Sequence, residues 1–155
     1  MKEMLEIKPM TGFGELKFGA TQDEVINVFG APEDTETIDV EGEIHEVVVW
    51  SYWEKGHAVY FEKELNGVCT NFETDNENAS LFGEQVFKLN QDAIISLMKK
   101  NGFEEYETED DADLDEHIIF FNDAHLQFVF ENDELALVSW AVAMDDDEKI
   151  LWPGE

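Results

Sequence analysis

Two eleven-residue stretches of this chain carry the same residue at six of their eleven positions. "FGELKFGATQD" begins at Phe13, and "FGEQVFKLNQD" begins at Phe82, which is 69 residues further on. With the chain shifted by 69 residues, seven of the fourteen positions from Phe13 to Ile26 carry the same residue. Ordinary residue usage gives about one identity in fourteen by chance. We therefore predict that residues 12–80 and 81–150 are two copies of one structural unit.

Each predicted unit begins with a short extended segment, Glu15 to Phe18 or Gln85 to Leu89, and continues with a helix. Thr21 and Glu24 match the capping-box pattern in the first unit, and Asn90 is a suitable N-cap in the second. Apolar residues at helical spacing follow both caps. A glycine then ends each helix, Gly30 in the first unit and Gly102 in the second. Pro32 is a second stop signal in the first unit.

Four strands are expected after each helix, because short runs of β-branched and aromatic residues alternate with turn residues. Asn66-Gly67 is the clearest hairpin signal among these turns. The expected strands are Thr35–Val40, His45–Trp53, His57–Glu62 and Val68–Glu73 in the first unit, and Tyr106–Thr108, Glu116–Phe121, His125–Glu131 and Leu135–Val142 in the second.

These elements predict an α+β fold. It consists of two tandem repeats of a helix plus a four-stranded antiparallel meander, with the helices packed on one face of a shared sheet. The 155 residues, of which 43% are apolar, are enough for a single domain made of both repeats, residues 1–155.

The alternation of residues along the strands predicts which side of the sheet is buried. His57, Val59 and Phe61 share one face of their strand, and Leu126, Phe128 and Phe130 share the matching face in the second unit. This face should cover the helices and leave the opposite face to solvent. Candidate partner-binding residues on that opposite face are Trp53, Tyr60, Glu62, Phe120, Glu131 and Trp140. For each aromatic, core filling or a seam between the repeats is the alternative interpretation.

The charge of the chain excludes one large class of function. Thirty-eight acidic residues and nine basic ones give a net charge of −29, and every basic residue is a lysine. Direct nucleic-acid binding depends on Lys and Arg at the phosphates, so we do not expect it. A protein with so large a negative charge attracts cationic partners. Solubility, or adaptation to a high-salt host, is the alternative explanation of the charge.

No recognisable catalytic motif occurs in the sequence, and we expect a protein that is not an enzyme and has no cofactor. "EDDADLDEH" fails as a calcium-binding EF-hand loop, because Glu116 and Asn122 stand where its Gly and Glu are needed. No metal site is expected there or in "MDDDEK". The lack of a long apolar run and the lone Cys69 predict a cytoplasmic protein without a membrane segment.

"FGATQDEVINVFGAP", from Phe18 to Pro32, resembles a signature of the β-lactamase-inhibitory-protein-like fold, which is also found in small outer-membrane assembly lipoproteins. The matching positions are Gly19, Thr21, Glu24, Val25, Gly30 and Pro32, and the second unit has Lys88 and Asn101 at the first and last of them. The resemblance implies a tandem helix-plus-four-strand duplication whose open concave sheet face binds a target protein.

Three interpretations of function follow. The first is a non-enzymatic, acidic protein-binding inhibitor, in its most concrete form an immunity-type protein that neutralises a cationic toxin or nuclease through the open sheet face. The second is a structural or housekeeping module that uses the same face as a homodimer seam. The third is an enzyme without a recognisable motif. The first two predict a monomer and a homodimer, respectively.

Overall fold

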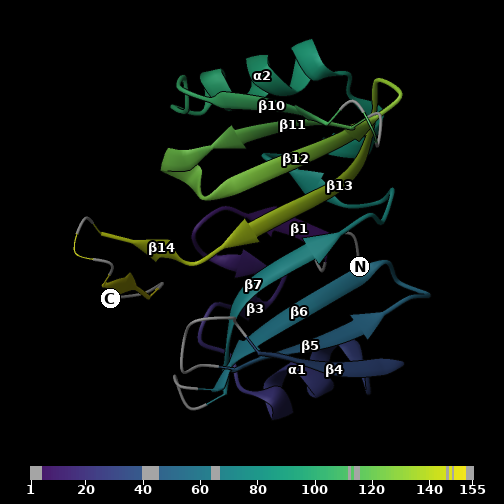
Figure 1. Cartoon of the computed structure of the whole chain (residues 1–155), viewed down its shortest axis with the longest axis vertical. Helices are drawn as coiled ribbons and strands as arrows, with labels where there is room; N and C mark the ends of the chain where they lie inside the picture. Colours follow the sequence, from purple (N-terminus) through teal and green to yellow (C-terminus); the bar gives the residue numbers. More distant parts are fainter. Residues whose placement is uncertain are drawn as a thin grey trace.

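The computed structural model describes residues 5–39, 46–63, 67–111, 113, 116–145, 147 and 149–152. Its main element is an eight-stranded antiparallel sheet with the strand order β10-β11-β12-β13-β7-β6-β5-β4 (Figure 1). The strands are β4 (Asp34–Asp39), β5 (Glu46–Tyr52), β6 (His57–Glu62), β7 (Val68–Thr74), β10 (Glu107–Asp111), β11 (Glu116–Phe121), β12 (Leu126–Glu131) and β13 (Glu134–Ala141).

Strands β7 and β13 meet at the centre of this sheet, where Phe72 pairs with Trp140 and Glu73 with Ser139. The register shifts once between β6 and β7, after Tyr60, and once between β12 and β13, after Val129. Such bulges bend a sheet and increase its twist. Both lie one strand away from the central pair, so the two halves of the sheet bend at similar places.

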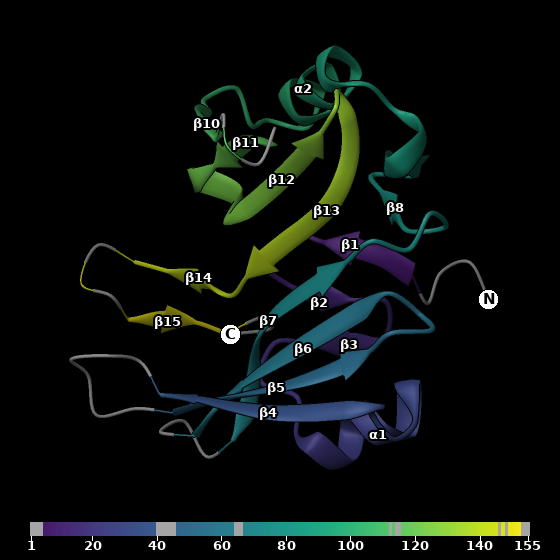
Figure 2. The same cartoon turned by 45° about the vertical axis from the view of Figure 1, so that its right-hand side comes forward.

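A second sheet of five short strands has the order β3-β2-β1-β8-β9. Its strands are β1 (Glu6–Lys8), β2 (Gly12–Phe13), β3 (Leu16–Lys17), β8 (Ser80–Leu81) and β9 (Glu84–Gln85). Strands β1 and β8 pair in parallel, which joins the segment before the first predicted unit to the end of that unit. Figure 2 shows this small sheet behind β7 and β13. A third sheet, β14 (Ala143–Met144) with β15 (Ile150–Leu151), continues from β13.

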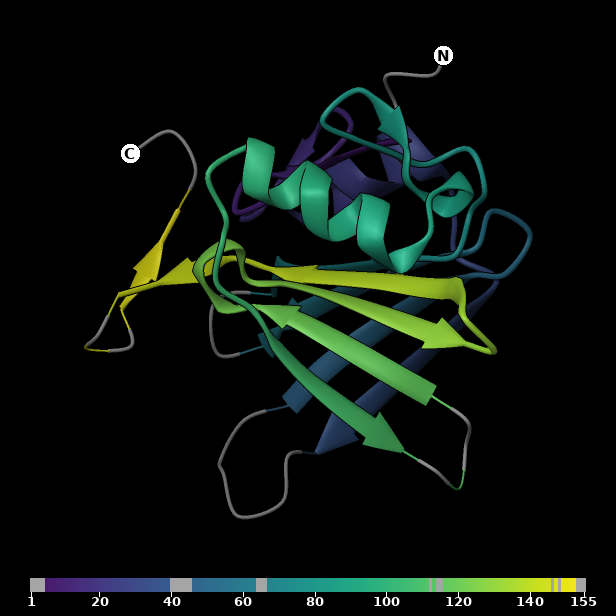
Figure 3. The same cartoon turned by 90° about the horizontal axis from the view of Figure 1, so that it is seen from above.

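The two α-helices, α1 (Gln22–Phe29) and α2 (Gln91–Lys100), lie on the same side of the large sheet as the small one (Figure 3). The capping box of Thr21 and Glu24 is present at the start of α1, and the Asn90 side chain accepts the N–H of Ala93 at the start of α2. Helix α1 buries Val25 and Phe29, and α2 buries Ile94 and Met98. The predicted N-caps are therefore confirmed. The structure also contains the 3-10 helices η3 (Val86–Lys88) and η4 (Asn122–Ala124).

The core lies between the large sheet and the layer of helices and short strands. Phe13 of β2 is at its centre, with its ring 5.0 Å from that of Trp140, 5.8 Å from Phe72 and 5.8 Å from Phe29. The indole N–H of Trp140 donates a 2.9 Å hydrogen bond to the carbonyl oxygen of Gly12. Edge-to-face rings and a satisfied indole N–H stabilise a core beyond simple burial. These contacts join the two sheets.

The predicted fold class is wrong. Strands hold 49% and helices 20% of the described residues, and only two α-helices are present, so the molecule is mostly β rather than two helix-plus-four-strand repeats. The prediction also lacked the five-stranded sheet. Its strands are only two or three residues long, and β1 pairs with β8, more than 70 positions away. Periodicity over so few residues is too weak to detect, and non-local pairing has no local signal. The assignment of residues 12–80 and 81–150 as copies stays a prediction.

Individual strands were predicted better than the fold class. The ranges His57–Glu62 and Glu116–Phe121 agree with β6 and β11 at both ends. All residues expected on the covered face are buried, as for His57, Phe61 and Phe128 at 4%, 0% and 0% exposure. The extended segment expected at Gln85–Leu89 is wrong, since η3 occupies most of it. The Asn66-Gly67 turn includes Asn66, which lies outside the described residues.

Among the described helices, none is long and apolar enough to cross a membrane.

The structure predicts different roles for two of the tryptophans. Replacing Trp140 with Phe should lower the free energy of unfolding by about 2–3 kcal/mol, because the buried Gly12 carbonyl loses its donor and a void is left. Trp53 is 68% exposed, so Trp53→Phe should change the stability by less than about 0.5 kcal/mol. Urea unfolding followed by circular dichroism measures both. Equal effects of the two substitutions would contradict the packing described here.

His57 should make the stability depend on pH. Its ring is buried against Phe13 and Phe29, and its Nδ1 lies 2.8 Å from the Thr74 hydroxyl, while its Nε2 has no partner. Burial, and then the charge of Lys55, lower the pKa of His57 from 6.5 to about 4. Between pH 6.5 and about 4, His57 is therefore protonated in the unfolded chain but neutral in the folded protein. The stability that is present above pH 6.5 is lost as the pH falls toward 4.

We expect this loss to be about 3 kcal/mol, since one pKa unit corresponds to 1.36 kcal/mol. The measurement is the difference in unfolding free energy between the wild type and His57→Asn at pH 7 and at pH 4. The other three histidines and all carboxylates are common to both proteins, so their titration cancels in the difference. A difference that stays constant with pH would rule out a neutral, buried His57.

Candidate functional site

The side of the large sheet that faces away from both helices is the candidate functional site, and we call it the open face. In Figure 3 the helices and the small sheet lie together on the other side. Among the described residues, no helix or strand packs on the open face. One row of register partners crosses it from strand to strand: Asp34, Ser51, Ala58, Glu73, Ser139, Gln127, Phe120 and Glu107.

The open face carries one apolar or aromatic pair in each half of the sheet. Val49 and Tyr60 pair across β5 and β6, and Ile118 and Val129 pair across β11 and β12. Val49 and Val129 are 7% and 8% exposed. Tyr60 and Phe120 are half-buried. Large side chains held on a rigid sheet bind a partner at a small cost in conformational entropy.

Charge on the eight strands has one sign only. None of the nine lysines lies in them, whereas they contain thirteen Asp and Glu residues. The register assigns ten of these carboxylates to the open face: Asp34, Glu36, Glu62, Glu73, Glu107, Glu109, Asp111, Glu116, Glu131 and Glu134. Most of them lie on the outer strands or at strand ends, so that they form a negative border around the middle of the face.

Glu73 is an exception, because it lies in the central strand pair. It accepts a 2.6 Å hydrogen bond from the hydroxyl of Tyr60. Burial raises the pKa of the Tyr60 phenol, and so do its hydrogen bond with Glu73 and the negative charges of Glu73 and Glu36. Tyr60 therefore remains a neutral donor throughout the physiological range. The bond fixes the phenol ring and the carboxylate in position before any partner arrives.

Five of the six sequence-predicted binding residues lie in strands, and these five fall into two groups. Tyr60, Glu62, Phe120 and Glu131 have the strand parity of the open face. Trp140 does not, since it is 1% exposed on the covered face and bonded to Gly12. Its placement on the open face is thus corrected. The reason is register: Ser139, one residue earlier, faces solvent, and a shift by one residue turns a side chain to the other side.

Trp53 belongs to the turn between β5 and β6, where its side chain is 68% exposed. Contacts from other segments hold this turn. The Glu33 carboxylate accepts the N–H of Glu54 at 3.3 Å, and the Lys55 ammonium donates to the carbonyl oxygen of Phe29 at 2.9 Å. Asn76 donates to the carbonyl oxygen of Lys55 at 2.8 Å. An exposed tryptophan on a turn fixed in this way is suited to be an interface anchor.

A hollow of about 210 Å³ opens on the second half of the open face. Its lining includes Phe120, Gln127 and Ser139 from the central row, with Asn71 and Ala141 beside them. His125 also lines it, from a left-handed backbone position with φ 52°. No pattern in the sequence marks Asn71, Gln127 and Ser139 as a group, because they lie in three different strands and neutral polar residues are common on exposed sheet faces.

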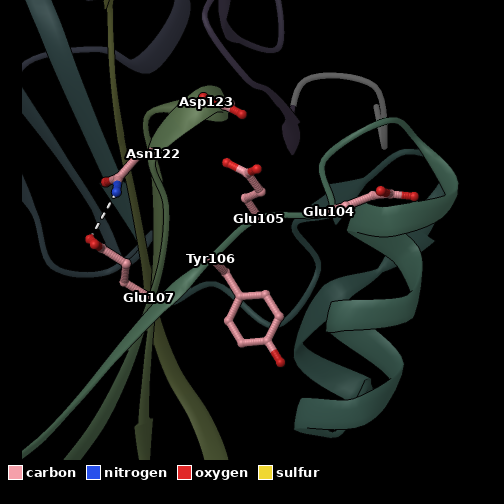
Figure 4. Close-up of a pocket in the computed structure, with 6 residues that line it drawn as sticks. All are labelled: Glu104, Glu105, Tyr106, Glu107, Asn122 and Asp123. Carbon is pink, nitrogen blue, oxygen red and sulfur yellow. Dashed lines mark hydrogen bonds between the residues drawn. The ribbon is translucent and has the colours of Figure 1, made fainter.

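A larger hollow, of about 430 Å³, lies at the edge strand β10 and contains four carboxylates (Figure 4). Asn122 donates a 2.9 Å hydrogen bond to Glu107 at one side of it. The side chains of Glu104 and Glu105 point in different directions in the close-up, and Tyr106 lies below them. Acidic residues on an edge strand also oppose pairing with another sheet edge. This hollow therefore has a structural explanation.

No cluster of three metal-ligating side chains occurs among the described residues. Of the acidic stretch near His117, Asp115 lies outside them. The Nδ1 of His117 contacts the carboxylate of Asp110, and its Nε2 lies 3.2 Å from the side-chain nitrogen of Gln91. Cys69 is fully buried, and burial raises the pKa of its thiol. A buried thiol with a raised pKa is a poor nucleophile.

The Tyr60–Glu73 bond gives a test of the open face. Glu73→Gln should lower the pKa of Tyr60, because it removes the nearest negative charge that disfavours the phenolate. Titration of tyrosine absorbance, with Tyr60→Phe to identify the signal, measures the change. Glu77→Gln removes a charge from the exposed segment that follows β7 and is the matched control. An identical titration of Tyr60 in wild type and Glu73→Gln would contradict the hydrogen bond.

Comparison of this chain with protein-family models, with curated proteins and with solved structures finds no match.

Proposed function

We propose that this protein is a non-enzymatic, acidic inhibitor that binds a basic protein through the open face. The most concrete form of the proposal is an immunity-type protein that covers the cationic active site of a toxin such as a nuclease. The observation that carries it is the distribution of charge: ten carboxylates and no lysine on the open-face positions of the eight strands. The resemblance of residues 18–32 to the inhibitor-protein signature agrees with this role and stays a prediction.

The physical basis is that the charged border and the middle of the open face have different roles in binding. Carboxylates around the face attract a cationic surface from a distance and increase the rate of encounter. The half-buried aromatic groups within the border, Tyr60 and Phe120, lose water on contact and slow dissociation. Carboxylates also mimic the phosphates that a nuclease binds. Binding in a reducing, cytoplasmic compartment is part of the same proposal.

The test compares two pairs of charge reversals. Glu62→Lys with Glu131→Lys changes two open-face positions, and Glu15→Lys with Glu84→Lys changes two exposed positions near the small sheet. Both pairs alter the net charge equally. Association rates with a panel of small basic nucleases, and inhibition of their activity, are measured at low and at physiological salt.

We expect the open-face pair to reduce the association rate about tenfold and the control pair less than threefold, because local charge steers the approach. Equal effects would mean that only the overall charge matters. A lack of binding to every basic nuclease would contradict the proposal in its concrete form. A salt-insensitive dimer that buries Tyr60 and Phe120, detected by sedimentation, would favour the homodimer seam instead.

A further inference from the structure

The hollow on the open face has three polar side chains without partners. Asn71, Gln127 and Ser139 line it, and the described structure contains no hydrogen bond from any of their side chains. Phe120 lies in the row next to Gln127, and Gln127 next to Ser139. Adjacent strands are about 4.8 Å apart, so the three side chains of this row span about 10 Å. An aromatic surface and unused amide and hydroxyl groups thus meet in a space of about 210 Å³.

Negative charge lies at both ends of this row. Glu73 pairs with Ser139 at one end, and Glu107 pairs with Phe120 at the other. No lysine is found in any of the four strands that line the hollow. A cation entering here would gain from two carboxylates without having to displace a positive charge of the protein itself. An anion would be repelled by both.

Resting on the proposed function, we propose that this hollow receives one arginine side chain of the basic partner. A guanidinium is planar and stacks on an aromatic ring such as that of Phe120. It carries five N–H donors, which suit the amide oxygens of Asn71 and Gln127 and the hydroxyl of Ser139. A lysine ammonium has no plane to stack and keeps its water more tightly. The hollow therefore selects arginine over lysine, whereas the negative border attracts both.

The corresponding place in the other half of the sheet gives a matched control. There, Ser51 pairs with Asp34 on one side and with Ala58 on the other. Ser139 likewise pairs with a carboxylate, Glu73. Ser51→Lys and Ser139→Lys thus introduce the same charge on the same face, opposite an acidic residue. Only Ser139→Lys fills the hollow with a cationic side chain.

Two kinds of probe test the inference. Acetyl-arginine amide and acetyl-lysine amide are titrated into the isotope-labelled protein and followed by NMR, and decaarginine and decalysine are titrated by calorimetry in 0.3 M NaCl. We expect the arginine amide to shift the signals of Phe120, Gln127 and Ser139, and decaarginine to bind at least fivefold tighter than decalysine. Ser139→Lys should weaken the binding of decaarginine at least tenfold, and Ser51→Lys should weaken it less than threefold.

The outcomes separate this inference from the proposed function. If decaarginine and decalysine bind equally, or if Ser139→Lys and Ser51→Lys weaken binding equally, the arginine hollow is overturned while the open face remains a site for cations. If neither peptide binds, both ideas fail. Should Ser139→Lys not fold, as judged by circular dichroism, Phe120→Leu and Gln127→Ala take its place, and loss of the arginine preference in both supports the hollow.

Discussion

Packing between Phe13 and Trp140 determines which side of the large sheet is covered. Their rings lie 5.0 Å apart, and the indole N–H of Trp140 bonds to Gly12, the residue before Phe13. Because both side chains are fully buried, strand β2 is held against the central strands β13 and β7. The small sheet and the helices thereby cover one face of the large sheet. The other face remains free of described helices and strands, and the proposed binding surface lies there.

An uncovered sheet has to be stable in water and must not associate with copies of itself. Antiparallel sheets tolerate one solvated face, and the carboxylates of the edge strands β4 and β10 repel another sheet edge. Part of the acidity therefore has a structural role. The middle of the face is different, since Tyr60, Phe120 and the hollow contribute little to either requirement. The contrast between this middle and its charged border is typical of a binding surface.

Local features were well predicted by the sequence. The capping box at Thr21 and Glu24 and the buried series His57, Val59 and Phe61 depend on residues a few positions apart, so the pattern in the chain is sufficient. Trp140 was placed on the wrong face because a single residue of register decides between core and solvent. The five-stranded sheet was missed because its strands are too short for a period to show. With that second sheet the strand content makes the fold class mostly β rather than α+β.

What the sequence by itself determined is the charge, the approximate positions of the eight long strands and the alternation along most of them. All of these follow from neighbouring residues. Only the tertiary structure decided that Trp140 is a core residue, that β1 pairs with β8, and that Asn71, Gln127 and Ser139 come together. The physical reason is that such contacts join segments far apart in the chain, and their geometry depends on register, bulges and packing that no local pattern specifies.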